Sequence, residues 1–464
     1  MFIGREYEIG ELERLYSSHV FEMAVIYGRR RIGKTRLITE FIRNKPAIYF
    51  QARRTNAQTN LQLLSQAILS YTSQISHAIF ATFDEAFETI LEMSRDKRLV
   101  LVIDEFPYLA QSFPEISSLL QEKIDHKFKE QSELMLILCG SSLSFMEEQV
   151  LGYESPLYGR RTAQFKLEPF DFFTAKQCWK GFNNTDAAVL YACTGGIPAY
   201  IEQIDNNQSL EQNITRLFLT PSGYLFEEPG NLLLQECKTP MQYDAIIQAI
   251  ASGKSKVSEI ASATKIPDSN TNMYLNKLIT LGIVKRELPY GETSNKKAVY
   301  ALQDQMFRFW YRFIPANQGL ILNNMPDAVF KRIEPYLSEY MGLVFEEICK
   351  QYLLSQAQQG RYDVVPALTQ RWWGNNPHTK SQDEIDLIVD DTQGAMLFVE
   401  CKWRNQPSSA DILEKLIDRS SLFTYKSAYY QVFSKSGFTE TCKELARSLQ
   451  NTTLTTFEDM CKFL

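Results

Sequence analysis

The first feature of the sequence that could do chemistry is the glycine-rich loop GRRRIGKT over residues 28–35. It follows the apolar run Met23–Tyr27, which is typical of a buried strand, and it precedes RLITEFI, which has a helical pattern. Strand, glycine loop and helix together form the context that a phosphate-binding loop requires. Glycines let the backbone wrap closely around phosphates, and its N–H groups then point inward at the helix N-terminus.

Two side chains at the end of this loop suit the phosphates of a nucleotide. Lys34 would neutralise the β- and γ-phosphates, and the Thr35 hydroxyl would be a ligand of Mg²⁺. Three arginines, Arg29, Arg30 and Arg31, lie inside the loop, where they either touch phosphate or a partner or remain solvated or salt-bridged.

Two further strand ends carry polar groups that fit the same chemistry. The run Leu99–Ile103 ends in Asp104 and Glu105, which follow it directly. Asp104 would hold Mg²⁺ through water, and Glu105 would orient or deprotonate the attacking water. The run Leu134–Cys139 is followed by Gly140-Ser141-Ser142, where a hydroxyl either contacts the γ-phosphate or attacking water or belongs to a simple turn. Another strand is predicted at Ala47–Phe50.

A second group of ionisable residues lies near the C-terminus. Asp386 is followed by Leu-Ile-Val, and the apolar run Ala395–Val399 leads into Glu400-Cys401-Lys402. On a strand Glu400 and Lys402 share a face, because side chains alternate. Two carboxylates can hold Mg²⁺ against a scissile phosphate while a lysine positions or activates water. The alternative is a solvated strand end in which Lys402 is the salt-bridge partner.

Glu346 or Glu347, from a helix predicted over Tyr340–Leu353, would complete this carboxylate group. The aromatic stretch Phe307–Phe313 before it is interpreted as core or interdomain packing.

The segment between these two groups predicts a winged helix. Its elements are helices over Tyr243–Ala251, Val257–Ala263 and Ser269–Leu281, then strand-like pieces at Ile283–Arg286 and Val299–Ala301. Three helices followed by a hairpin form a helix-turn-helix with a wing. Residues 236–320 contain 11 basic and 7 acidic residues, a net charge of +4.

Side chains of this segment could contact bases and phosphates. The predicted candidates are Asn270, Thr271, Asn272 and Lys277 on the third helix, with Met273, Leu275, Leu278 and Leu281 near its apolar face, and Lys296 and Lys297 in the wing. The alternative is that the winged helix contacts protein.

The composition is that of a multidomain globular protein. The 464 residues suggest about three domains, and 44% hydrophobic with 22% charged residues excludes a disordered, collagen-like or disulfide-stapled chain. The net charge of −6 argues against a wholly basic nucleic-acid binder. The eight cysteines form no CxxC pair, so reduced thiols in a cytoplasmic protein are expected. No signal peptide or membrane span is predicted.

The N-terminal motifs together resemble archaeal-type AAA+ ATPases of the branch close to the STAND NTPases. Residues 28–35, Asp104-Glu105 and 140–142 resemble the Walker A, Walker B and sensor-1 boxes. The resemblance also rests on the opening motif Phe2-Ile3-Gly4-Arg5-Glu6, on Tyr158-Gly159-Arg160 followed by Leu167-Glu168-Pro169-Phe170, and on Thr194-Gly195-Gly196-Ile197-Pro198.

This resemblance implies roles for several residues. Arg160 would be an arginine finger that reaches a neighbouring subunit, which implies a homo-oligomer; the alternative is an ion pair with Glu154 or Glu168. Pro198 would contact the base side of ATP. The expected nucleotide-binding residues are Gly28, Arg29, Arg30, Arg31, Ile32, Gly33, Lys34, Thr35, Arg36, Ser141 and Pro198. The expected catalytic residues of this site are Lys34, Glu105 and Arg160, and its metal ligands are Thr35 and Asp104.

The spacing Asp386…Glu400-x-Lys402, with Trp403 after the lysine, resembles the PD-(D/E)XK restriction-endonuclease-like domain often joined to this ATPase family. The resemblance implies catalytic roles for Asp386, Glu400 and Lys402 and metal binding by Glu346, Asp386 and Glu400. Such domains are also retained as inactive binding modules.

The sequence therefore predicts an α/β multidomain protein with a P-loop parallel sheet. The expected domains are an ATPase core (1–170), a helical lid (171–238), a winged helix (239–302), a connecting helical segment (303–339) and a nuclease-like domain (340–464). The favoured function is ATP hydrolysis coupled to binding or cleavage of nucleic acid, with DNA the expected partner, by residues 239–302 and 340–464. The alternatives are a signalling switch or DNA-binding regulator with an inactive nuclease-like domain, and an ATPase that remodels protein.

Overall fold

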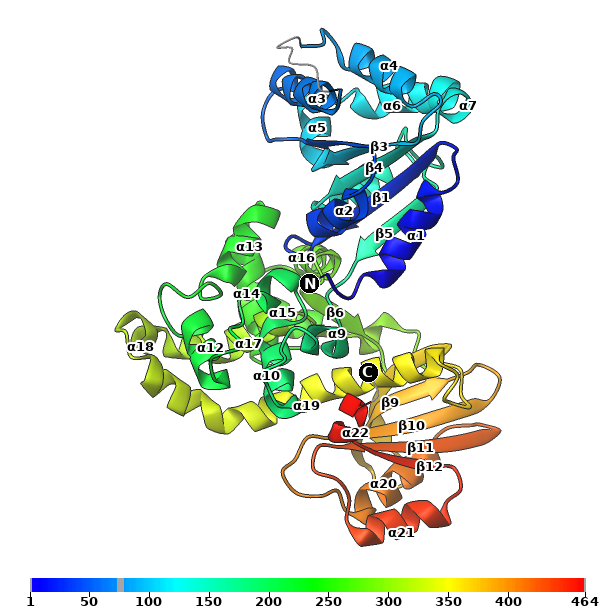
Figure 1. Cartoon of the computed structure of the whole chain (residues 1–464). Helices are drawn as coiled ribbons and strands as arrows, with labels where there is room; N and C mark the ends of the chain where they lie inside the picture. Colours follow the sequence, from blue (N-terminus) through cyan, green and yellow to red (C-terminus); the bar gives the residue numbers. More distant parts are fainter. Residues whose placement is uncertain (1, 73–78, 463–464) are drawn as a thin grey trace. The chain divides into compact units, whose positions relative to one another are not determined.

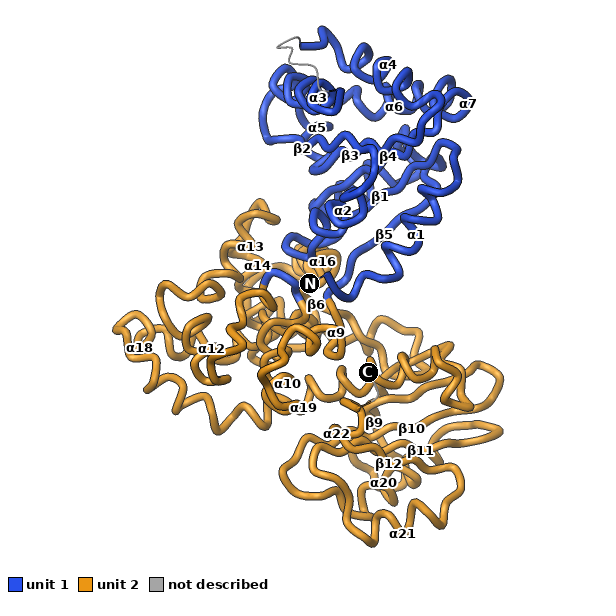
Figure 2. The backbone as a smooth tube through the Cα atoms, in the orientation of Figure 1, with its two compact units in different colours: residues 1–169, 197–199 blue, residues 170–196, 200–464 orange. Residues whose placement is uncertain are grey.

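The computed structural model describes residues 2–72 and 79–462, and the chain divides into two compact units. Unit 1 contains residues 1–169 and 197–199, and unit 2 contains residues 170–196 and 200–464 (Figure 2).

Unit 1 is built on a five-stranded sheet in the order β2-β3-β4-β1-β5 (Figure 1). Every pairing in it is parallel. The strands are β1 (Glu22–Gly28), β2 (Ala47–Gln51), β3 (Leu99–Asp104), β4 (Leu134–Gly140) and β5 (Ala163–Leu167). The four strands predicted from the sequence are confirmed, each extended by one or two residues.

The fifth strand, β5, was not predicted from the sequence. Its residues AQFKL alternate between exposed and buried, because it lies at the edge of the sheet. The three central strands β1, β3 and β4 are buried along their whole length. Continuous apolar runs are the expected pattern for parallel strands that are covered on both faces.

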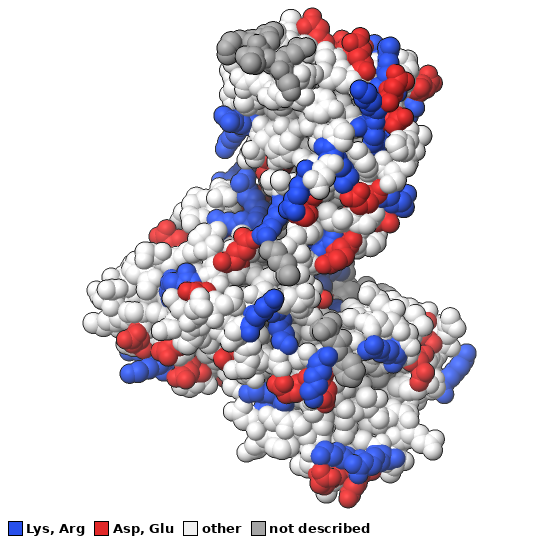
Figure 3. All heavy atoms as spheres, viewed as in Figure 1, with Lys and Arg blue, Asp and Glu red and all other residues white. Residues whose placement is uncertain are grey.

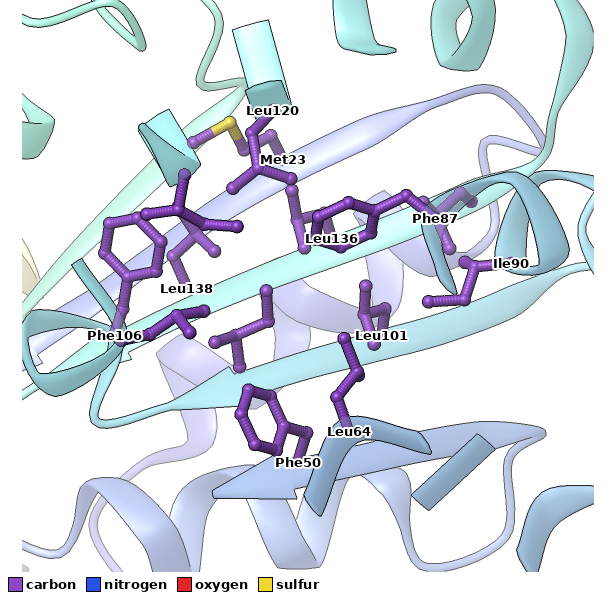
Figure 4. Close-up of a cluster of buried hydrophobic side chains, with 14 of the residues drawn as sticks. Met23, Phe50, Leu64, Phe87, Ile90, Leu101, Phe106, Leu120, Leu136 and Leu138 are labelled. Carbon is purple, nitrogen blue, oxygen red and sulfur yellow. The ribbon is translucent and has the colours of Figure 1, made fainter. Parts of the chain in front are cut away.

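Helices of unit 1 alternate with these strands. They are α1 (Glu6–Tyr16), α2 (Lys34–Ile42), α3 (Ala57–Tyr71), α4 (Phe83–Met93), α5 (Phe106–Ser112), α6 (Ile116–Lys123), α7 (Lys129–Gln131) and α8 (Leu143–Phe145). Figure 4 shows one core of this unit, where Leu101 of β3 and Leu136 of β4 meet Phe87 of α4 and Leu64 of α3. This packing holds the strand ends that carry the candidate nucleotide site.

Unit 2 begins with helices on the N-terminal side of the winged helix. They are α9 (Phe172–Lys176), α10 (Asn184–Thr194), α12 (Leu210–Phe218) and α13 (Glu228–Glu236), and α11 (Pro198–Ile201) runs across the boundary between the units. The winged helix follows as α14 (Pro240–Ala251), α15 (Val257–Thr264), α16 (Asp268–Thr280), β6 (Val284–Glu287) and β7 (Val299–Leu302). The two strands pair antiparallel, as the sequence predicted.

Two predictions for α16 were wrong. Thr271 was expected on the solvent face but is fully buried, and its hydroxyl donates to the Ile266 carbonyl at 3.2 Å. Met273 was expected on the apolar face but is 56% exposed. The reason is helical spacing: Thr271 shares the buried face with Leu275 and Leu278, four and seven residues on, whereas Met273 does not.

A single long helix, α19 (Pro326–Gln358), joins the helical part of unit 2 to its C-terminal sheet. Before it come α17 (Gln305–Phe313) and α18 (Gln318–Leu322). The Tyr340 hydroxyl of α19 lies 3.0 Å from the Ala192 carbonyl oxygen and 3.2 Å from the Gln305 carbonyl oxygen, and it has one proton to donate between them. Further along the helix, Phe345 packs on Trp403 with 5.1 Å between ring centroids. The predicted helix Tyr340–Leu353 and the predicted domain border at 339/340 therefore both lie inside α19.

The C-terminal sheet has the order β12-β11-β10-β9-β8 and mixes parallel and antiparallel pairs. Its strands are β8 (Leu368–Asn376), β9 (Ser381–Asp390), β10 (Ala395–Lys402), β11 (Ser427–Ser434) and β12 (Thr452–Thr456). Its helices are α20 (Ala410–Ser420), α21 (Glu440–Ser448) and α22 (Phe457–Lys462). With the parallel sheet of unit 1 and the winged helix, this mixed α/β sheet confirms the predicted fold class.

The loop of the wing is anchored to this sheet. The Tyr290 hydroxyl donates to Asp390 at 2.5 Å, and the Tyr290 N–H donates to the Arg371 carbonyl at 2.8 Å. The Tyr290 ring packs edge-on against Phe423 with centroids 5.7 Å apart. The wing loop therefore packs at its base against the C-terminal domain.

Replacing Tyr290 tests this anchor. We expect Tyr290→Ala to increase amide hydrogen exchange in residues 287–299, because the aromatic contact and the hydroxyl bond are both lost. Tyr290→Phe loses only the hydrogen bond, which is worth about 1 kcal/mol, and should therefore increase the exchange rates less, about fivefold. Tyr336→Ala, at a 53% exposed position of α19, is the control. Equal exchange in wild type and Tyr290→Ala would contradict the anchor.

Candidate functional site

The glycine loop joins the end of β1 to the start of α2, as the sequence predicted. Gly33, which immediately precedes Lys34, has φ of +90°. This backbone conformation is unfavourable for a residue that carries a side chain. Lys34 is buried, and its ammonium donates to the carbonyls of Gly28 and Arg29 at 2.9 and 3.0 Å. Burial lowers the pKa of Lys34, although Glu105 and Asp104 oppose this effect.

Thr35 and Asp104 are brought together by the fold. The Thr35 hydroxyl donates to Asp104 Oδ2 at 3.2 Å, and the Glu105 N–H donates to Asp104 Oδ1 at 2.9 Å. Sequence reasoning missed Tyr49 of β2, whose hydroxyl donates to Asp104 Oδ2 at 2.5 Å. Burial and this hydrogen bond raise the pKa of Tyr49, so it stays protonated and holds the carboxylate in place. Two hard oxygen donors beside a lysine fit Mg²⁺ bound to a nucleotide.

Ser141 meets Glu105 at the same edge of the sheet. The Ser141 Oγ lies 2.9 Å from both Glu105 Oε1 and Oε2, and a serine hydroxyl has one proton to donate between them. Glu105 has φ of +53°. For a residue with a side chain this left-handed backbone conformation is uncommon, and it is found disproportionately at functional sites.

Two segments distant in sequence support the loop. Arg5 of the opening motif is buried and donates to the carbonyls of Ile32 and Glu168 at 3.3 and 2.8 Å. A Cβ built on Gly33 would lie 3.7 Å from Pro198 Cγ, so Pro198 lies beside the loop.

The arginines in and after the loop are engaged within the chain. The Arg30 guanidinium donates to the Tyr108 hydroxyl at 3.0 Å. Arg29, Arg31 and Arg36 also interact with neighbouring groups.

Arg160 has an ion-pair partner that sequence reasoning did not name. Its guanidinium donates to both oxygens of Asp125, with Nε at 3.0 Å from Oδ1 and Nη2 at 2.5 Å from Oδ2. It also donates to the carbonyls of Pro156 and Tyr158 at 2.8 and 3.0 Å. This pair lowers the pKa of Asp125, chiefly through the hydrogen bond from Arg160. Glu154 and Glu168 were the partners considered from the sequence.

In unit 2 the fold brings together three of the predicted C-terminal residues. Lys402 Nζ lies 2.5 Å from Glu400 Oε1 and 3.6 Å from Asp386 Oδ2. The Cys401 N–H donates to Asp386 Oδ2 at 2.8 Å. Both carboxylates are buried, with exposed fractions of 5% for Asp386 and 6% for Glu400. Asp386 of β9 and Glu400 of the adjacent strand β10 therefore lie in one site. Glu400 and Lys402 share a face of β10, as the alternation of side chains along a strand predicted.

Glu346 faces the same group from α19. Burial and the charge of Asp386 raise the pKa of Glu346 to about 8. Burial and Asp386 also raise the pKa of Glu400. Both effects have the same cause: burial, together with the nearby negative charge of Asp386, disfavours the ionised form of each carboxyl.

Two arginines, which sequence reasoning missed, border this carboxylate group. Arg371 of β8 lies 3.7 Å from Glu346 Oε2, and Arg419 of α20 lies 3.5 Å from Glu400 Oε2. Arg419 also pairs with Asp383 at 2.7 Å. No motif spacing indicates them, because they come from elements far apart in the sequence. Trp403 packs on Phe345 and Phe457.

The fit of this site to a metal ion rests on two carboxylates. Glu400 Oε2 is buried and makes no hydrogen bond with any described residue, and the Arg419 guanidinium lies 3.5 Å from it, so a cation bound there would compete with this ion pair. Within residues 2–72 and 79–462, however, no three His, Cys, Asp or Glu side chains come together closely enough to hold a metal ion. The predicted three-carboxylate ligand set, with Glu346, stays a prediction.

The winged-helix residues that are candidates for contact with nucleic acid lie near both basic and acidic side chains. Asn270 and Asn272 are exposed on α16, and Asn272 Nδ2 donates to the Asp268 carbonyl at 3.0 Å. Lys297 pairs with Glu292 at 2.7 Å, while Lys296 is exposed. In Figure 3, basic and acidic side chains lie next to each other at several separate places on the face shown.

The Arg160–Asp125 pair gives a measurable prediction. Because the pair is bidentate and only partly exposed, a double-mutant cycle with Arg160→Ala and Asp125→Ala should give a coupling free energy of about 1–2 kcal/mol in chemical denaturation. The cycle Arg14→Ala with Glu11→Ala, an exposed i,i+3 pair of α1, is the control and should give less than about 0.5 kcal/mol. A coupling near zero for Arg160 would mean that the pair does not stabilise the fold.

Comparison with known proteins identifies three regions. Residues 2–204 match an ATPase domain described as predominantly from Archaea. Residues 245–286 match the helix-turn-helix of bacterial regulatory proteins of the ArsR family. Residues 310–415 match DUF234, described as archaeal and bacterial proteins of unknown function.

Individual relatives agree with these matches. The uncharacterised protein MJECL04 of Methanocaldococcus jannaschii is 32% identical over 409 residues, which cover 87% of this chain and 88% of that protein. The uncharacterised ATP-binding protein MJ0423 of the same organism is 44% identical over 45 residues, 10% of this chain and 76% of that protein.

Among solved structures, the Walker-type ATPase PABY2304 of Pyrococcus abyssi has a TM-score of 0.52 at 20% identity, covering 67% of this chain and 96% of that one. This likeness supports the fold.

No helix in the described ranges 2–72 and 79–462 is long and apolar enough to cross a membrane. On its overall similarity to MJECL04, the chain belongs to the same protein family, and it carries an archaeal-type ATPase domain, an ArsR-type helix-turn-helix and a DUF234 domain.

Proposed function

We propose that this protein hydrolyses ATP in unit 1 and uses the nucleotide state to control how unit 2 binds and cleaves DNA. The observation that carries the ATPase part is the convergence of Thr35, Asp104, Glu105 and Ser141 at one edge of the parallel sheet. That edge, outside the carboxyl ends of parallel strands, is where α/β proteins commonly bind ligands.

Each residue of this site has a separate role in the proposed hydrolysis. Lys34 leaves its carbonyl partners and neutralises the phosphates, and Thr35 and Asp104 would hold Mg²⁺, which would supply positive charge to the transferred γ-phosphoryl group and the leaving ADP. Glu105, kept in place by Ser141, orients the attacking water and accepts its proton. Tyr49 positions Asp104 by its hydrogen bond. Arg160 is a proposed finger for a second copy of the chain, and its pair with Asp125 must open for that role.

Chain connectivity supports coupling to unit 2. Residues 197–199 belong to unit 1, yet the residues on both sides of them belong to unit 2. Gly196 has φ of +72°, and a Cβ there would lie 1.9 Å from the Phe170 carbonyl oxygen, so this junction admits only glycine. A shift of Pro198 caused by nucleotide is therefore passed along a tightly constrained stretch of chain.

DNA binding is proposed for the helix-turn-helix, because residues 245–286 match regulatory proteins of the ArsR family. The exposed residues Asn270 and Asn272 of α16 would reach the bases, and Lys296 of the wing would contact phosphate. The eight free cysteines, all in the described part of the chain, suit a reducing compartment such as the cytoplasm.

Cleavage is proposed for Asp386, Glu400 and Lys402. The two carboxylates would hold Mg²⁺, which supplies positive charge to the scissile phosphate. Lys402, which lies beside Glu400, would position the attacking water. A second candidate function is nucleotide-controlled DNA binding without cleavage, and it is favoured by the finding that no three potential ligands converge among the described residues.

The ATPase assignment is tested at Glu105. We expect Glu105→Gln to lower kcat for ATP hydrolysis about 100-fold or more while ATP still binds, because the amide cannot accept the water's proton. Lys34→Ala should lose ATP binding itself. Glu115→Gln, an exposed position shortly after α5, is the matched control and should hydrolyse ATP normally. Phosphate release and nucleotide titration measure the two quantities, and an unchanged kcat in Glu105→Gln would exclude this role.

The cleavage assignment is tested at Glu400. Labelled single- and double-stranded DNA is incubated with the protein, with Mg²⁺ or Mn²⁺ and with or without ATP. We expect cleavage by the wild type and by Glu414→Gln, an exposed control on α20, and a loss of at least 100-fold in Glu400→Gln. Intact DNA in all conditions, together with ATP-dependent binding in a fluorescence-anisotropy assay, would replace this assignment with the binding-only function.

A further inference from the structure

The C-terminal carboxylates lie where the pairing of β9 with β10 ends. The last antiparallel pair of these strands joins Leu387 and Val399, and Asp386 and Glu400 are the next residues on the two strands. One residue further on, the Cys401 N–H donates to the Asp386 carboxylate at 2.8 Å. The two carboxylates are thus at the end of the paired region, and a side chain of α20 reaches them there.

Arg419 is this side chain of α20. Leu413 and Leu416 of the same helix are fully buried in the core of the C-terminal domain. Arg419 comes three residues after Leu416, so it lies near the same face of the helix. Its side chain is only 18% exposed, and its Nη1 lies 3.5 Å from Glu400 Oε2. The helix therefore places a positive charge directly beside one of the two proposed metal ligands.

Both oxygens of Glu400 already have a cationic neighbour. Lys402 Nζ lies 2.5 Å from Oε1, and Arg419 Nη1 lies 3.5 Å from Oε2. Oε2 makes no hydrogen bond with any described residue, so the nearby guanidinium compensates it by charge alone. A Mg²⁺ bound to Oε2 at about 2.1 Å would lie within about 5.6 Å of Nη1. Coulomb repulsion between two cations at this separation opposes binding unless the guanidinium moves.

A second carboxylate lies closer to Arg419 than Glu400 does. Arg419 Nε is 2.7 Å from Asp383 Oδ1. Asp383 is itself fixed, because its Oδ2 accepts from Asn376 Nδ2 at 3.1 Å and its Oδ1 accepts from the Glu384 N–H at 3.0 Å. Asn376 is fully buried. Arg419 can therefore move away from Glu400 and still keep an ion pair with a firmly held partner.

The two cations beside Glu400 differ in this respect. The carboxylate partners of Lys402 are Glu400 and Asp386, and both of them are proposed metal ligands. Asp383, the closer partner of Arg419, lies outside the proposed ligand set. Arg419 is thus the cation that can leave the ligands without losing its own compensating charge.

We propose that Arg419 is an autoinhibitory counter-ion of the C-terminal site. While its guanidinium lies beside Glu400, it excludes Mg²⁺ from Oε2, and the site binds a cation when the guanidinium pairs with Asp383 alone. This inference rests on the proposed cation site in unit 2. It concerns cation binding, which is measured without DNA and without cleavage.

Titration of the nucleotide-free, full-length protein with Mn²⁺ tests this role, with unbound Mn²⁺ measured by electron paramagnetic resonance. We expect Arg419→Gln to bind Mn²⁺ at least about tenfold more tightly than the wild type does. The reason is that one neighbouring charge changes the proton affinity of a carboxyl by about 10- to 1,000-fold, and Mn²⁺ carries twice the charge of a proton. Arg419→Lys, which keeps the positive charge, should lose this gain. Arg447→Gln removes an exposed arginine from α21 and is the matched control.

Two further variants connect the gain to Glu400 and guard against a loss of folding. The double variant Arg419→Gln with Glu400→Gln should bind Mn²⁺ no more tightly than the wild type, because the ligand itself is removed. Arg419→Met keeps the aliphatic stem of the side chain and removes its charge, so it should reproduce the gain if Arg419→Gln does not fold. Circular dichroism checks the folding of each variant.

The outcomes separate the role of Arg419 from the proposed cleavage. An Mn²⁺ affinity that is unchanged in both Arg419→Gln and Arg419→Met would refute this role, and so would a gain that persists without Glu400. Absence of Mn²⁺ binding from every variant would refute the cation site and the role of Arg419 together. Intact DNA in the cleavage assay would remove only the proposed cleavage, because the Mn²⁺ titration measures binding alone.

Discussion

The parallel pairing of β4 with β1 on one side and β3 on the other is the constraint on which the candidate nucleotide site depends. In this register Tyr27 is paired with Gly140, so the glycine loop and Ser141 leave the sheet side by side. Asp104 ends the neighbouring strand β3. The buried apolar side chains of these strands hold the three ends in place, and the polar groups beyond them can meet although they are distant in the sequence.

Unit 2 depends on a different element, the 33-residue helix α19. A helix of this length extends about 50 Å, enough to contact two parts of the unit in turn. Along it lie Tyr340, bonded to the helical part, and Glu346 at the carboxylates. With the wing loop anchored by Tyr290, the helix-turn-helix and the carboxylate group are connected by packed structure.

Sequence patterns were sufficient to predict the features that depend on residues close together in the chain. The glycine loop, the strand ends at Asp104 and Ser141, and the shared face of Glu400 and Lys402 follow from local spacing and strand alternation. Local spacing was less reliable on α16, where the buried face starts at Thr271 and leaves Met273 exposed. There the helix carries few strongly apolar residues, so its phase was poorly defined by the sequence.

The amino-acid sequence alone determined the glycine-rich loop between strand and helix, the order of the regions and the residue types of both candidate sites, because each is encoded within a short continuous segment. Only the tertiary structure identified the side-chain partners. Tyr49 donates a hydrogen bond to Asp104, Asp125 pairs with Arg160, and Arg371 and Arg419 lie beside the C-terminal carboxylates. These contacts join residues far apart in the chain, and only packing of the whole fold decides which long polar side chains meet.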